Sequence, residues 1–195
     1  MTAFGFAGRG AIALAGAALA ALYVFVLFPA ASAKSGSPDN RVVDLQRSHR
    51  VDQFVAVLER WSAANPKAVG IMKRENILKL DSSFPAIYGV TLAFLYAWTT
   101  GHRTPTRLDT WLFVAPLLAA AFDYVENIFE LYALEGIETL SNVTYAKDHG
   151  LFDARAILIQ SISAHIKYVL LAVSIVGVAI AAAARVIRFV QHHAS

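Results

Sequence analysis

The stretch AAAFDYVENIFELYALEG, residues 119–136, decides the fold because it interrupts an apolar helix with polar side chains. Within about two helical turns come Asp123, Glu126, Asn127 and Glu130. Upstream, the uninterrupted apolar run Trp111–Phe122 covers about 18 Å as a helix, whereas the hydrocarbon core of a bilayer is ~30 Å thick. If this helix crosses a membrane, Asp123 and Glu126 must lie at bilayer depth.

Composition favours a membrane protein. Of the 195 residues, 57% are hydrophobic and 16% are charged, whereas a soluble domain carries about 25% charged residues. The net charge is +3, but the Lys and Arg residues form no basic helix or aromatic-lined groove, so no nucleic-acid partner is expected. The absence of cysteine excludes disulfides, thiolate metal ligands and a cysteine nucleophile.

Four apolar segments approach or reach the length that spans a bilayer, about 20 residues. Their periodicity is helical, and no strand alternation competes with it. They are Ala11–Ala30, Phe84–Thr100, about Leu108–Tyr132 and about Ala156–Val190, of which the second is short. The sequence therefore predicts an all-α integral membrane four-helix bundle. Its expected parts are an N-terminal transmembrane segment (1–33), an extracytoplasmic loop (34–81) and a three-helix transmembrane core (82–195).

The first segment has two interpretations. Arg9 precedes it and Ala31-Ser32-Ala33 follows, as in a cleaved signal peptide, which would leave three helices. Its apolar run is longer than the about 7–15 residues of a signal core, and the spacing of Gly16 and Ala20 suits close helix packing. Retention is therefore favoured.

The charges of the short loops predict the orientation. If four helices alternate, Arg9, Arg103, Arg107, Arg185 and Arg188 share one side. The positive-inside rule then places both termini in the cytoplasm of a bacterium, with a multi-pass chain in its inner membrane. The opposing observation is the Lys34–Leu80 loop, which this orientation places outside although it carries nine Lys and Arg residues.

That outer loop contains an amphipathic helix. Apolar residues recur at helical spacing, with charged residues on the opposite face. They are Val51, Phe54, Val55, Leu58 and Trp61. The helix is expected to pack on the outer face of the protein or in the headgroup layer, and the alternative is a lid over an outward-facing pocket.

Helical geometry predicts which way the polar residues of the third segment point. Asp123, Glu126, Asn127 and Glu130 fall within a sector of about 100°, and bulky apolar residues occupy the opposite side. Because a carboxylate facing lipid is costly, the cluster is expected to face the interior of the bundle.

Lys167 and His165 on the fourth segment are the candidate partners of these carboxylates. They stand about 200° apart around the helix, so only one of them can face the cluster squarely. Lys167 is predicted to form the ion pair, with His165 as the titratable alternative. The competing interpretations are that Lys167 reaches toward the headgroups and that His165 is a packing residue.

The second segment begins with LDSSFPAIYG, residues 80–89. Asp81 or one of the serines after it is expected to cap this helix. Tyr88 lies on the Asp81 face, from which its hydroxyl can reach the acidic cluster.

LDSSFPAIYG together with FDYVENI, residues 122–128, resembles a motif pair of a group of small bacterial integral membrane proteins. The resemblance covers roughly residues 43–132. It implies a four-helix bundle and assigns Asp81, Tyr88, Asp123, Glu126 and Asn127 to a site. It implies no activity.

The sequence leaves the function open between several classes. The cluster could bind a lipid-like ligand, or it could fix the helices of an accessory subunit that docks a membrane-protein partner. It could also supply the acid and base groups of a membrane enzyme acting on a lipid, or oxygen ligands for a divalent cation. No phosphate loop, nucleophile elbow or His-Glu-x-x-His motif is present, so no cofactor and no metal are expected.

Overall fold

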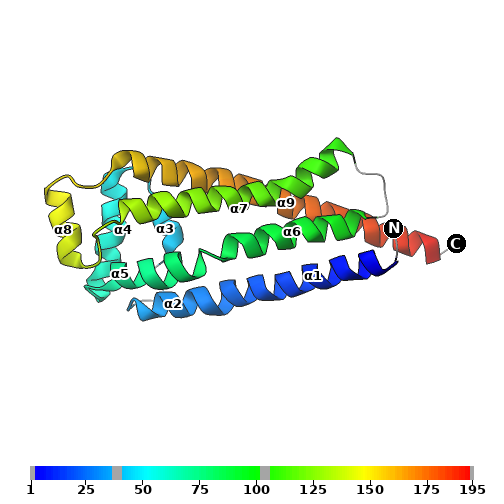
Figure 1. The fold of residues 1–195 in the computed structure, drawn as a ribbon, viewed down its shortest axis with the longest axis horizontal. Helices are drawn as coiled ribbons and strands as arrows, with labels where there is room; N and C mark the ends of the chain where they lie inside the picture. Colours follow the sequence, from blue (N-terminus) through cyan, green and yellow to red (C-terminus); the bar gives the residue numbers. More distant parts are fainter. Residues whose placement is uncertain (1–2, 37–40, 102–105, 194–195) are drawn as a thin grey trace.

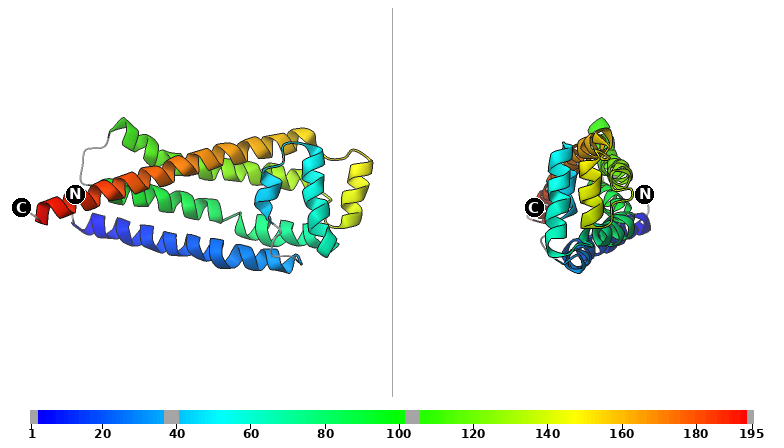
Figure 2. Two further views of the ribbon diagram at one scale, coloured as in Figure 1. Left: turned by 180° about the vertical axis from the view of Figure 1, so that it is seen from behind. Right: turned by 90° about the vertical axis from the view of Figure 1, so that its left-hand side faces the viewer.

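The computed structural model describes residues 3–36, 41–101 and 106–193, and in that part of the chain all regular structure is helical (Figure 1). Long helices lie side by side along most of the molecule, and shorter helices cover one end of them (Figures 1 and 2). The prediction of an all-α fold is confirmed.

The first long helix is continuous from Ala3 to Lys34. It comprises α1 (Ala3–Leu22), a π-helical stretch η1 (Tyr23–Leu27) and α2 (Phe28–Lys34). Pro29 lies in the first turn of α2 and has no N–H to donate to the preceding turn, and the wider π turn lies directly before it.

The other long helices are α6 (Phe84–Thr100), α7 (Arg107–Ala133) and α9 (Ala154–His193). Among the described residues, three spans are long and apolar enough to cross a membrane: Arg9–Lys34, Arg107–Ala133 and Ala154–Gln191. Four were expected. The exception is α6, whose 17 residues are fewer than the about 20 that a full crossing needs.

Small residues let these helices approach one another closely. A Cβ atom at Gly16 of α1 would collide with the Thr91 side chain of α6. At Gly89 of α6 it would lie 3.0 Å from Ala120 Cβ and 3.1 Å from the Pro116 carbonyl oxygen, both on α7. Glycine therefore permits the close contacts of α6 with α1 and α7, and at Gly16 this agrees with the packing expected from the sequence.

The short helices form what we call the cap. It consists of α3 (Val42–Gln46), α4 (Val51–Ala64), α5 (Ala68–Met72), η2 (Lys73–Leu80) and α8 (Leu140–Asp148). The predicted amphipathic helix is α4, and its apolar face forms the cap's core with Phe54, Leu58 and Trp61 fully buried. The structure thus shows α4 packed on the protein itself.

Ion pairs join the first helix to the cap. Glu75 of η2 accepts hydrogen bonds from Lys34 at the end of α2 and from Lys79. These two ammonium groups lower the pKa of Glu75 to about 2. The carboxylate therefore stays charged and holds the end of the long helix against η2.

Both chain ends lie at the end of the molecule opposite the cap (Figure 1). Arg185 of α9 donates to the Trp98 carbonyl oxygen over 2.9 Å, and Arg107 begins α7 near that end. Arg103, the further basic residue expected there, lies outside the described residues.

Candidate functional site

The acidic residues of α7 point into the molecule. Asp123 is 4% exposed and Asn127 6%, while Glu126 and Glu130 are completely buried. On the opposite face of the same helix, Ile128 is 63% exposed. The α7 helix therefore has one polar, buried face and one apolar, exposed face.

Lys167 of α9 lies between two of these carboxylates. Its Nζ is 2.9 Å from Asp123 Oδ1 and 2.6 Å from Glu126 Oε2, and its side chain is 6% exposed. From α6, the Tyr88 hydroxyl donates to the other Asp123 oxygen over 2.8 Å. One polar cluster thus connects three helices at one level, and both oxygens of Asp123 have partners.

Asp81 does not occupy the N-cap position of α6. It follows η2, and the N-cap residue of α6 is Ser83, one of the two serines expected there, although the Ser83 side chain makes no capping hydrogen bond. The Asp81 carbonyl accepts a hydrogen bond from Asn127 Nδ2 over 3.1 Å. Asp81 is only 7% exposed.

His165 does not join the cluster. It is exposed, its Nδ1 lies 2.7 Å from the Ser161 carbonyl oxygen, and its ring centroid is 4.9 Å from that of His49. Because His165 and Lys167 are about 200° apart on α9, burying Lys167 turns His165 outward. The alternative of His165 as a partner of the carboxylates is therefore wrong.

A cavity of about 560 Å³ lies beside the cluster. Its charged wall contains Asp81, Asp123, Lys167 and the Tyr88 hydroxyl. The rest of its wall is mainly apolar and comes from the first helix, α3, α6 and α9, including Val24, Phe28, Pro29, Val42, Val43, Phe84 and Leu171. The cavity therefore combines charged and apolar lining residues in one space, as the binding of an amphiphile requires.

The α3 helix lines this cavity with Val42, Val43 and Gln46, which no pattern in the sequence indicated. Gln46 of α3 lines the cavity and accepts a hydrogen bond from the Tyr168 hydroxyl over 2.5 Å. Nearby, the Ser161 hydroxyl lies 2.5 Å from His49 Nδ1. The segment Val42–Gln46 has only five residues, too few for periodicity to reveal which side chains face inward.

Some buried polar atoms in the same region have no hydrogen-bond partner. They are Glu126 Oε1, Asn127 Oδ1, both carboxyl oxygens of Glu130, and both side-chain polar atoms of Gln160. Because α7 and α9 run antiparallel, the pairing of Asp123 with Lys167 also places Glu130, seven residues after Asp123, at the level of Gln160, seven residues before Lys167. Buried polar groups without a hydrogen-bond partner are costly, and the packing of apolar helices does not need them.

The described residues contain no group of three or more His, Asp or Glu side chains arranged to hold a metal ion. The geometry therefore adds no support to the divalent-cation interpretation.

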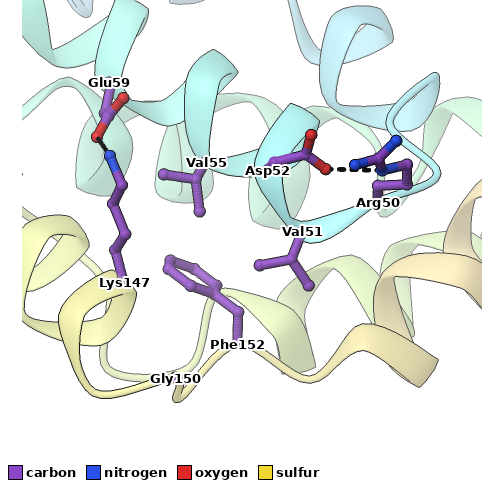
Figure 3. Close-up of a pocket in the computed structure, with 8 residues that line it drawn as sticks. All are labelled: Arg50, Val51, Asp52, Val55, Glu59, Lys147, Gly150 and Phe152. Atoms are coloured by element: carbon purple, nitrogen blue, oxygen red, sulfur yellow. Dashed lines mark hydrogen bonds and ion pairs between the residues drawn. The ribbon is translucent and has the colours of Figure 1, made fainter.

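A second hollow, of about 540 Å³, lies on the cap between α4 and the α8–α9 connection (Figure 3). Two exposed ion pairs border it, Glu59–Lys147 at 2.7 Å and Arg50–Asp52 at 3.0 Å, and Phe152 lies between them (Figure 3). Exposed ion pairs contribute little energy, and no buried polar group faces this hollow. It is a surface groove of the cap.

Comparison of the chain with known protein families, curated proteins and solved structures finds no match. The resemblance of LDSSFPAIYG and FDYVENI to small bacterial membrane proteins therefore stays a prediction.

Proposed function

We propose that the chain is an integral membrane four-helix bundle, with the first helix retained and the cap on the extracytoplasmic side of a bacterial inner membrane. The support is the apolar side chains that the first long helix, α7 and α9 leave exposed, among them Phe25 at 77%, Ile128 at 63% and Val169 at 63%. A soluble monomer rarely exposes contiguous apolar surface on this scale.

The α6 helix alone is too short to cross a bilayer, but the turn before it lengthens this segment. The protein shields that turn, which fits the proposal. Non-helical backbone at membrane depth is tolerated where it is buried in protein or lines a cavity. The turn before α6 meets that condition, since Asp81 is buried, lines the cavity and bonds to Asn127 through its carbonyl.

We propose further that the cavity binds a lipid-like amphiphile. The observation that carries this is the union, in one space of about 560 Å³, of a mainly apolar wall and a buried charged wall. That volume falls within the range of about 300–1,000 Å³ typical of small-molecule sites. Val24 lines the cavity and is also 46% exposed, so a ligand can enter from the apolar surface beside it.

The test is to block the apolar wall without touching the polar residues. Leu171→Trp fills the cavity, and Val173→Trp is the matched control because Val173 lies on the same helix but is 46% exposed. Mass spectrometry of lipids that stay bound after purification should find a specific amphiphile on the wild type and on Val173→Trp. The amount of this amphiphile bound to Leu171→Trp should be lower by about tenfold or more. Equal retention by all three proteins would refute the binding role.

The second candidate is an accessory or structural subunit, favoured by the buried Lys167–Asp123–Glu126 ion pairs that tie α7 to α9. Such pairs can fix helix register without any ligand. This candidate predicts that the wild type itself retains no specific amphiphile. A membrane enzyme is less well supported, because both oxygens of Asp123 are already engaged by Lys167 and Tyr88.

A further inference from the structure

Asp81 is the carboxylate that the cavity leaves without a partner. Within the described part of the chain its side chain makes no hydrogen bond and no ion pair, although it lines the cavity and is only 7% exposed. Asp123, the other lining carboxylate, has Lys167 on one oxygen and Tyr88 on the other. A buried acceptor is costly unless something donates to it.

The charged residues around the cavity also disfavour an anionic ligand. Lys167 is the buried cation of the wall, and Asp123 and Glu126 already flank it. Glu130, fully buried below them, adds a further carboxyl. Arg41 lines the cavity too, but its side chain is exposed, so water screens its charge.

We infer that the amphiphile carries a hydrogen-bond donor at its polar end, a hydroxyl or an amine, and that Asp81 is the residue that accepts from it. The inference rests on the proposed binding function and names the headgroup class of the same cavity. Asn76 and Gln46 line the same space and supply neutral polar contacts around the headgroup. The chain of the amphiphile lies against Phe28 and Leu171.

Three probes of equal chain length test the inference on the wild-type protein: hexadecanol, hexadecylamine and palmitate. Retention is measured by native mass spectrometry of the full chain released from lipid nanodiscs. Hexadecanol, hexadecylamine or both should be retained at least about tenfold better than palmitate, as expected for one hydrogen bond to a charged group. A preference for the amine alone would show that charge dominates recognition, and equal retention of alcohol and amine would show that donation suffices.

Asp81→Asn tests the assigned residue, with Asp148→Asn on the exposed surface of α8 as the matched control. The first variant should reduce the preference over palmitate about tenfold, and the second should leave it unchanged. A preference that survives in folded Asp81→Asn would overturn the inference, and so would palmitate binding the wild type as tightly as the alcohol and the amine. If Asp81→Asn does not fold, the order in which the wild type retains the three probes decides whether the inference holds. Retention of none of the three probes would refute the proposed function and the inference together.

Discussion

Lys167 shows how one residue can organise the interior of this protein. A buried ammonium is expensive to remove from water, and here two carboxylates at 2.9 Å and 2.6 Å compensate for it. Asp81 lies at the same cluster without a partner of its own among the described residues, so its charge is not compensated in the same way.

The pH dependence of stability should reveal Asp81. Its side chain is buried and has no hydrogen-bond or ion-pair partner among the described residues, so its charged form is costly in the folded protein. Asp81→Asn stays neutral throughout. Between pH 5 and pH 8 its unfolding temperature, followed by tryptophan fluorescence in detergent, should therefore fall less than that of the wild type.

The control for this experiment is Asp148→Asn, which should follow the wild type because Asp148 is exposed. Parallel loss of stability in the wild type and Asp81→Asn would mean that Asp81 ionises in the folded protein as it does in water.

At the scale of elements, the structure depends on close contact of α6 with α7. Gly89 contacts Ala120 and the Pro116 carbonyl, and Tyr88 beside it reaches Asp123 across the same interface. Helix packing and the geometry of the site are therefore coupled through two neighbouring residues.

Gly89→Val should separate these helices. The added side chain overfills the interface and should destabilise the protein by about 1–3 kcal/mol, measured as a lower midpoint of unfolding. Val90→Ile is the control, because Val90 is 42% exposed on the same helix. A Gly89→Val midpoint equal to that of the control would show that α6 and α7 do not need this close approach.

The sequence predicted the elements better than their junctions. Period and length predicted the helices that became α6, α7 and α9 to within a few residues, and the spacing of Asp123, Glu126 and Glu130 predicted their burial on one face. The position of Asp81 could not be predicted, because a capping position and the end of a π-helical turn look alike in the sequence LDSS. The α3 lining of the cavity depends on tertiary contacts such as Gln46–Tyr168, which span 122 residues.

At the scale of the whole molecule, the cap and the long helices distribute apolar and charged side chains in opposite ways. The cap has its own apolar core and exposed ion pairs, while the long helices expose apolar side chains and bury charged ones. This inversion is what a chain partly in lipid and partly in water requires. The polar cluster lies where the long helices reach the cap, since Asn127 of α7 bonds to Asp81 at the end of η2.

The most direct test of this account is the depth of the acidic cluster in a bilayer. The chain has no cysteine, so a spin label can be attached at Ile128→Cys, on the exposed face of α7 at the level of the cluster, and at Ser141→Cys on the exposed surface of α8 as the control. In lipid nanodiscs the label at position 128 should be relaxed by oxygen and not by a water-soluble nickel chelate. The label at position 141 should show the reverse. Strong relaxation of the label at position 128 by the nickel chelate would place the cluster in water and contradict the account.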